Sequence, residues 1–164
     1  MAYWIETGIP AKLAIMPRPN GGKQLEGEIR LLKREGADVL VSLLTPEEEE
    51  ELALEHERAA CSGYGIKFRS FPIPDRRVPD SAEAFLKFID SLHDDLLNKR
   101  SIVAHCRAGI GRSSLLLAAL MRREGLSTDD AFRRITQARG MLVPDTAEQL
   151  RWVETLPLNP ERID

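Results

Sequence analysis

The segment 101–123 constrains the fold more than any other part of the chain, because it joins three different patterns. Residues 101–106, S-I-V-A-H-C, form a short apolar run of the kind found in strands buried on both faces. The glycine-bearing loop 107–112, R-A-G-I-G-R, follows, and the apolar run 113–123 predicts a helix. A strand, a tight loop and a helix in this order favour an α/β fold.

The rest of the sequence continues the alternation. Two short apolar pieces within residues 3–16 are candidate strands, and the continuous β-rich run 37–44 and the alternating run 66–73 predict two more. We therefore expect a central, mostly parallel sheet of about five strands flanked by helices, in a single domain spanning residues 1–164. Helices are expected over 25–34, after Thr45-Pro46, over 81–98, and from the capping segments 127–130 and 144–148.

Two helix starts carry acidic residues. Thr45 and Pro46 read as N-cap and first helical residue, and the glutamates at 47–51 then fall where the helix dipole favours acids. We interpret this acidic run as a solvated helix face. Asp80 is interpreted as the cap of the 81–98 helix.

Composition limits the classes of function. The net charge of −3 argues against broad binding to nucleic acid or anionic membrane, and the longest uncharged stretch, 113–121, is too short to span a bilayer. The opening residues lack the pattern of a signal peptide, and two cysteines cannot make a disulfide framework. We expect a cytoplasmic monomer that needs no cofactor. Zinc is disfavoured because no second Cys or His pair accompanies His105 and Cys106.

The loop after the 101–106 strand has the features of a phosphate cradle. Successive N–H groups from Arg107 to Gly111, including those of Ala108 and Ile110, can curl around an anion, and the next helix points its positive end at the same spot. Gly109 and Gly111 supply torsions that other residues resist. No G-x-x-x-x-G-K-[ST] motif occurs, so a P-loop NTPase is excluded.

Cys106 is expected at the floor of this cradle, where the same donors stabilise a thiolate that can attack phosphorus. Arg112 can return to the bowl and bind two phosphate oxygens with its planar fork. Ser113 can donate its hydroxyl to the sulfur and make it a better leaving group. His105 is expected to hydrogen-bond backbone and shape the loop rather than to act as a base.

A phosphoester with a poor leaving group also needs a proton donor, which later activates water. The loop 71–80, F-P-I-P-D-R-R-V-P-D, offers Asp75 and Asp80. Because Asp80 already has a capping role and Asp75 follows a strand end on the edge where α/β sheets build sites, we assign Asp75 as the general acid.

The segment 105–113 resembles the signature H-C-x-x-G-x-x-R-[ST] of the protein tyrosine phosphatase superfamily. Together with I-P-D (73–75) and the stretches 4–19, 36–43 and 138–149, it is similar to the compact atypical dual-specificity phosphatases. Ser114 departs from the glycine of many members, at no expected cost to chemistry. The resemblance implies that Gln149 helps to orient the hydrolytic water; alternatively, Gln149 is an exposed residue of an amphipathic helix.

The expected function is a dual-specificity protein phosphatase acting through a phosphocysteine intermediate. Alternatives are a phosphatase for a non-protein ester (a phosphoinositide, a nucleotide or an RNA 5′-phosphate) and a non-catalytic module that binds phosphoproteins. Lipid phosphatases of the superfamily often carry a basic residue where Ile110 stands, which disfavours phosphoinositide. Cys61 is interpreted as a structural cysteine, with a resolving thiol for Cys106 as the alternative.

Overall fold

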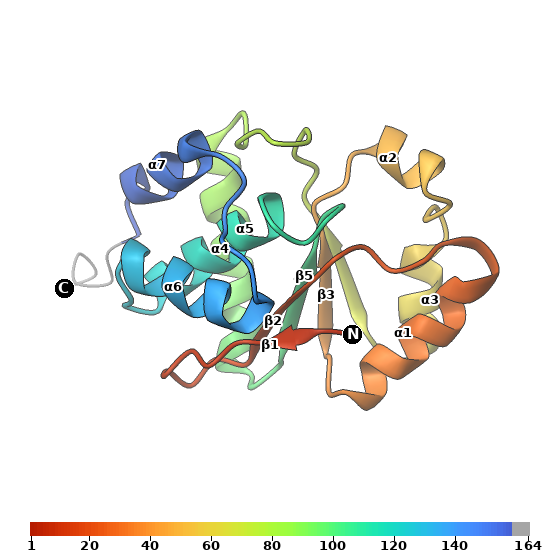
Figure 1. Cartoon of the computed structure of the whole chain (residues 1–164). Helices are drawn as coiled ribbons and strands as arrows, with labels where there is room; N and C mark the ends of the chain where they lie inside the picture. The colour runs from red at the N-terminus through yellow and green to blue at the C-terminus, as the bar shows by residue number, and fades with distance from the viewer. Residues whose placement is uncertain (159–164) are drawn as a thin grey trace.

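The computed structural model describes residues 1–158, which form an α/β fold around a five-stranded sheet (Figure 1). The strands are β1 (Tyr3–Trp4), β2 (Leu13–Met16), β3 (Val39–Ser42), β4 (Lys67–Ser70) and β5 (Ile102–His105). Their order across the sheet is β1-β2-β5-β3-β4, with β1 antiparallel to β2 and every other pair parallel. The predicted, mostly parallel sheet is confirmed. Residues 159–164, the end of the predicted domain, lie outside the described part.

The predicted helices form, and one further helix forms over residues 57–63, where the sequence predicts none. No helix in the described residues is long and apolar enough to cross a membrane. A 3₁₀ turn (Gly22–Gln24) precedes the first α-helix. The helices are α1 (Leu25–Arg34), α2 (Pro46–Glu51), α3 (Glu57–Gly63), α4 (Ala82–Leu97), α5 (Arg112–Arg123), α6 (Thr128–Arg139) and α7 (Ala147–Thr155).

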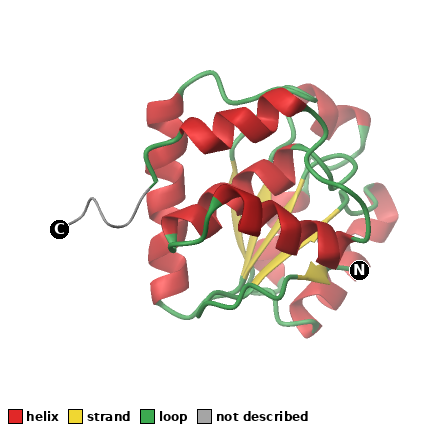
Figure 2. Cartoon of the chain, turned by 60° about the vertical axis from the view of Figure 1, so that its left-hand side comes forward, coloured by secondary structure: helices red, strands yellow, loops and turns green. Residues whose placement is uncertain are grey.

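Alternate strand residues supply two hydrophobic cores, one on each face of the sheet. On one face Ile15, Val41 and Ala104 belong to a core with residues of α4, α5, α6 and α7. On the other face Leu40 and Val103 belong to a core with residues of α1 and α3. Figures 1 and 2 show the helices on both sides of the strands. Each fully buried Leu or Ile stabilises this packing by about 1.5–3 kcal/mol.

Capping residues define where α2 and α4 begin. Thr45 caps α2, as its sequence predicts, and it does so in a reciprocal box with Glu48. The predicted cap of α4 is wrong by one residue: the Ser81 hydroxyl accepts from the Ala84 N–H at 3.0 Å, and Asp80 is exposed. Ser81 has the extended backbone of an N-cap, which leaves Asp80 one position too early to reach the first turn.

Three connections meet at the carboxyl edge of the sheet because β5 lies between β2 and β3, and β3 neighbours β4. From this edge β5 leads into the loop before α5, β3 leads into α2, and β4 leads into the segment 71–81 (Figure 1). Open α/β sheets build their sites at this edge. The fold thus brings together segments that are far apart in the sequence.

Candidate active site

A cavity of about 240 Å³ opens at this edge of the sheet. It lies over the loop between β5 and α5 and receives side chains from the segment after β4 and from the segment before α7. The lining residues are Asp75, Arg76, Cys106, Arg107, Ala108, Gly111, Arg112 and Asp145. The structure therefore brings the predicted nucleophile, arginine and acid to one place.

The carbonyls of the loop 106–111 all accept hydrogen bonds from groups around the loop. In a trans peptide the C=O and the following N–H point in opposite directions, so a carbonyl held outside turns the next N–H inward. This explains how the loop presents a row of donors. The contacts run from His105 Nδ1 to Cys106 O (3.1 Å), Arg18 N to Arg107 O (3.2 Å), Arg139 Nη2 to Ala108 O (3.1 Å), Arg139 Nε to Gly109 O (3.0 Å), and from Ser114 Oγ, shared between Ile110 O and Gly111 O.

The two loop glycines lie close to neighbouring segments, and Gly109 is required by its backbone surroundings. Gly109 has a φ of 71°, and a Cβ there would lie 2.6 Å from backbone atoms of Met16 and Pro17. A Cβ on Gly111 would lie 2.8 Å from Asp145 Oδ2 and 2.9 Å from Gln149 Oε1. The predicted special torsion is confirmed at Gly109 and is wrong at Gly111, whose φ of −88° is one that any residue adopts.

The Cys106 sulfur lies among hydrogen-bond donors. Its Sγ is 3.3 Å from Ser113 Oγ, and the side chain is 3% exposed. Burial by itself raises the pKa of the thiol, but the Ser113 hydroxyl, the backbone N–H groups of Ser113 and Ile110 and the charge of Arg112 outweigh it, so the pKa is lowered. This surrounding favours a thiolate.

Arg112 is buried and its guanidinium is held on several sides. Its Nη1 and Nη2 donate to the two oxygens of Glu48 at 2.7 and 2.9 Å, and Nη1 also donates to Ile73 O at 2.8 Å. Nη2 donates in addition to Asp75 Oδ1 at 3.1 Å. Burial lowers the pKa of Arg112, but Glu48, Cys106 and Asp75 raise it overall, so the group stays charged.

Comparison with known proteins connects this geometry to a family. The sequence profile described as "Tc-R-P: Polymorphic toxin system, DSP-PTPase phosphatase" matches residues 14–126, a range that contains Asp75, Cys106 and Arg112. The chain belongs to this phosphatase family. It is thus a cysteine-dependent phosphatase, with the fold expected of a compact atypical dual-specificity enzyme.

Individual relatives agree with this assignment. The phosphatase is 34% identical over 83 residues to mouse dual specificity protein phosphatase 1, a match that covers 48% of the chain but only 22% of the mouse protein. In fold it is similar to kinase associated phosphatase, with a TM-score of 0.83, 20% identity and coverage of 93% of this chain and 91% of the other. It is also similar to PTPMT1 in complex with PI(5)P, with a TM-score of 0.73, 14% identity and coverage of 94% of each chain.

The sequence suggests that the acidic run 47–51 is a solvated helix face, but the structure shows that part of it is buried and paired. Glu48 is 9% exposed and pairs with Arg112, and Glu51 pairs with Arg107 at 3.0 Å. Burial raises the pKa of Glu48, but Arg112 and Thr45 lower it overall, so the carboxylate is charged. Arg107, predicted to bind substrate, thus lies at the mouth of the pocket in an ion pair.

Gln149 is buried, which makes its interpretation as an exposed residue wrong. Its Oε1 accepts from the backbone N–H groups of Asp145 and Thr146 at 3.1 and 3.2 Å, and its Nε2 donates to Arg77 O at 3.1 Å. These bonds tie the Asp75 segment to the start of α7. Gln149 is not among the residues that line the pocket, but Asp145, which no sequence motif singles out, is. Asp145 Oδ1 lies 3.9 Å from Arg76 Nη1.

The second cysteine lies on the other side of the sheet. Cys61 is fully buried in the core with α1 and α3, whereas Cys106 belongs to the core with α5. Both are free thiols. A disulfide between them would have to cross the sheet, which favours the structural interpretation of Cys61.

Proposed function

We propose that the phosphatase hydrolyses phosphotyrosine, phosphoserine and phosphothreonine in proteins through a phosphocysteine intermediate on Cys106. The observation that carries the proposal is the convergence of Cys106, Arg112 and Asp75 on one small pocket. A cytoplasmic location is proposed with it, since both cysteines are free thiols.

In the first step the Cys106 thiolate attacks phosphorus in line with the leaving oxygen. The sulfur–phosphorus bond forms as the phosphorus–oxygen bond breaks, and Asp75 gives its proton to the departing oxygen. The inward N–H groups of the loop and the Arg112 guanidinium stabilise the charge on the three remaining phosphate oxygens.

Arg112 and Asp75 change partners when substrate binds. The Nη2 group that donates to Asp75 is needed by a phosphate oxygen, whereas the Nη bonds to the buried Glu48 keep the fork in place. Asp75, with a side chain 55% exposed, is then free to take up a proton and turn to the leaving group. Substrate binding therefore releases the acid at the moment when it is needed.

In the second step water attacks phosphorus and passes its proton to Asp75, and the sulfur leaves as a thiolate. The Ser113 hydroxyl, 3.3 Å from Sγ, stabilises this leaving group. Gln149 fixes the backbone of Asp145 and Thr146 behind the pocket, which supports a role in placing the water through this segment.

Breadth of substrate is supported by the shape of the pocket. It is small, and its lining within residues 1–158 includes no aromatic side chain that would reserve it for an aryl phosphate. The three arginines that line it, Arg76, Arg107 and Arg112, all face carboxylates. This favours a single phosphate monoester over a ligand with several phosphates. The likeness to PTPMT1 bound to PI(5)P nevertheless makes a phosphoinositide the second candidate substrate.

Hydrolysis of a chromogenic aryl phosphate without divalent metal tests the proposal first. Activity is expected to fall as pH rises above the acidic range, because the working form combines a Cys106 thiolate with a protonated Asp75. A panel of phosphotyrosine and phosphothreonine peptides, phosphoinositide, nucleotide and RNA 5′-phosphate then separates the substrate classes. A strict metal requirement, or preference for a non-protein ester over both peptides, would contradict it.

Asp75→Asn tests the assigned acid, with the exposed Asp80→Asn as its matched control. Asp75→Asn should slow alkyl phosphates more than aryl phosphates by at least about tenfold, since only a poor leaving group needs the proton. Asp80→Asn should change neither rate. Equal losses on both classes of ester, or a larger loss in Asp80→Asn, would move the acid elsewhere.

A further inference from the structure

His105 points away from the pocket that its neighbour serves. Along β5 the side chains alternate, so that Ala104 and Cys106 join the core with α5 while Val103 joins the core with α1 and α3. His105 follows the Val103 side and is fully buried. There it meets Glu57, the first residue of α3, which is 1% exposed.

Both ring nitrogens of His105 face oxygen atoms. Nδ1 lies 3.1 Å from the Cys106 carbonyl oxygen, and Nε2 lies 2.6 Å from Glu57 Oε2. A carbonyl oxygen only accepts, so Nδ1 must carry a hydrogen. An ionised Glu57 carboxylate also only accepts, and beside it Nε2 carries a second hydrogen, which makes the ring an imidazolium.

The charges around the ring agree with this state. Among the described residues, the titratable groups that interact with His105 include Glu57 on α3, Glu49 on α2 and the Cys106 thiol. Burial lowers the pKa of His105, but the charge and hydrogen bond of Glu57, the Cys106 carbonyl and the Cys106 thiolate raise it overall. The second oxygen of Glu57, Oε1, is buried without a hydrogen-bond partner among the described residues.

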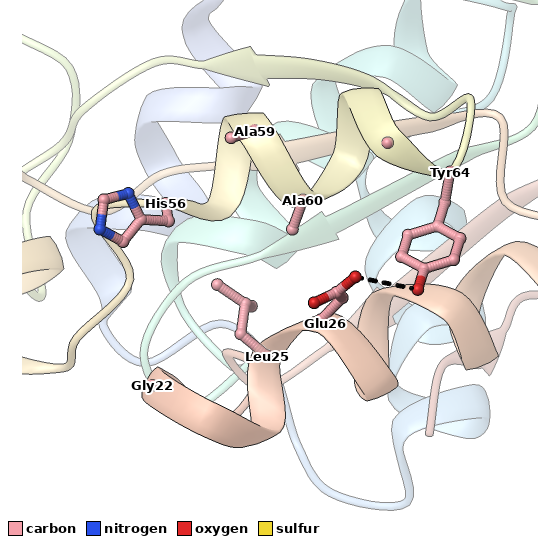
Figure 3. A pocket seen from close by; sticks show the side chains of 8 residues that line it. Gly22, Leu25, Glu26, His56, Ala59, Ala60 and Tyr64 are labelled. Atoms are coloured by element: carbon pink, nitrogen blue, oxygen red, sulfur yellow. Dashed lines mark hydrogen bonds between the residues drawn. The ribbon is translucent and has the colours of Figure 1, made fainter.

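A carboxylate buried in this way is costly unless it is paired, and its pairing here is with His105. The Glu57 carboxylate does not contribute to the outer face of α3. Figure 3 shows that His56, the N-cap residue of α3, and Ala59 and Ala60 of α3 line a pocket against α1. This pocket has a volume of about 500 Å³, and Glu57 is not part of its lining. Glu57 therefore belongs to the inner face of α3, where it contacts His105 next to the loop 106–111.

We propose that Glu57 is a positioning residue that keeps His105 as an imidazolium, whose Nδ1–H holds the Cys106 carbonyl and whose charge favours the Cys106 thiolate. The inference rests on the proposed role of Cys106 as nucleophile. It assigns to α3, on the opposite face of the sheet from the pocket core, an influence on the reactive sulfur. Glu57 acts through His105 and touches no substrate.

Glu57→Gln separates charge from geometry. The Gln amide can donate to Nε2 of a neutral ring, which leaves Nδ1–H free to keep its bond to Cys106 O. The variant thus retains the shape of the site and loses the positive charge. Glu55→Gln, at an exposed neighbouring position, is the matched control.

The readout is the pH dependence of iodoacetate alkylation at Cys106, measured by peptide mass spectrometry without any substrate. In Glu57→Gln the midpoint should rise by about one pH unit, the size expected when a nearby opposite charge is removed. Glu55→Gln should leave it unchanged. A folded Glu57→Gln protein with an unshifted midpoint would overturn the proposal, because a merely structural role of Glu57 does not change the ionisation of Cys106.

A second measurement needs no variant. In NMR spectra of the unaltered protein the His105 ring should show both N–H protons at pH 7 and keep them beyond the usual His pKa of about 6.5. A ring with one N–H proton at pH 7 would overturn the inference. These results are independent of turnover, so a failure to trap phosphocysteine would refute the proposed function and leave the role of Glu57 standing.

Discussion

The two cysteines of this phosphatase are both buried, yet their surroundings act on the thiols in opposite directions. Burial is the largest influence at Cys61, and with the charge of Glu57 it raises the pKa of that thiol to about 12. Burial is also the largest single influence at Cys106, but directed donors reverse it and lower the pKa. The comparison shows that depth in the protein does not decide whether a thiol is reactive; the hydrogen bonds and charges aimed at the sulfur do.

Glu57 makes the contrast sharper, because it acts on Cys61 and also contacts His105, the neighbour of Cys106. Its charge acts directly on Cys61 and disfavours a thiolate there. At the other thiol its charge is met by His105, which bonds to the backbone of Cys106. The same carboxylate therefore protects one cysteine from ionisation and supports the other.

Replacing each cysteine in turn should give the largest difference in turnover between two variants. Cys106→Ser should lower turnover of an aryl phosphate by on the order of 10³-fold or more, because it removes the nucleophile. Cys61→Ala should keep turnover within about twofold and lower the free energy of unfolding by about 1 kcal/mol. Steady-state kinetics and urea unfolding measure the two effects. Comparable loss of activity in both variants would contradict the assignment.

Glu48→Gln should have the next largest effect, because Glu48 holds Arg112, the buried guanidinium whose charge lowers the pKa of Cys106. Gln retains the helix cap but removes the charge that orients the guanidinium, and losing a charged hydrogen bond costs about 1.5–3 kcal/mol. We expect kcat to fall roughly ten- to a hundredfold. The exposed Glu50→Gln serves as control. Full activity in Glu48→Gln would show that the Arg112 guanidinium keeps its orientation without the charge of Glu48.

Ser113→Ala should slow turnover about tenfold and alter the limiting step, because it removes the side-chain donor closest to the Cys106 sulfur. The thiolate becomes a poorer leaving group, so phosphocysteine should accumulate. Stopped-flow assays with an aryl phosphate should then show an initial burst of product. The absence of a burst, with turnover unchanged, would remove Ser113 from the second step.

Arg139→Met should give the smallest effect, about two- to tenfold in kcat/KM, since it releases the carbonyls of Ala108 and Gly109. Arg133→Met, on the same helix but exposed, should be neutral. Assays of both variants at a fixed pH measure the difference. Equal behaviour of the two would mean that the loop keeps its shape without Arg139.

Local sequence is sufficient to predict the strands and every helix except α3, and to single out the loop after β5. The segment 105–113 carries its own strand, turn and helix signals, so its residues alone place Cys106, Arg112 and Ser113 together. Asp75 follows from its position after a strand end. The cap of α4 is misassigned from sequence because Asp80 and Ser81 are both good capping residues, and only backbone geometry distinguishes them.

Residues that depend on the order of strands could not be predicted. Glu48 reaches Arg112 because β3 lies beside β5, and nothing in the acidic run 47–51 reveals that neighbour. The same holds for Glu57 under His105. Arg139 belongs to a helix whose polar residues look solvated in a one-dimensional pattern, yet it donates to a carbonyl of the loop. Gln149 is named by the family resemblance, but the sequence does not reveal its bond to the Arg77 carbonyl.

Residue-resolved alkylation of the unaltered phosphatase tests the central claim most directly. With iodoacetate at increasing pH, Cys106 should react with a midpoint well below the value of about 8.5 for a free cysteine, because a lowered pKa leaves thiolate present at lower pH. Cys61 should stay unmodified until the protein unfolds. A Cys106 midpoint at or above the free value, or equal reactivity of the two thiols, would contradict the account.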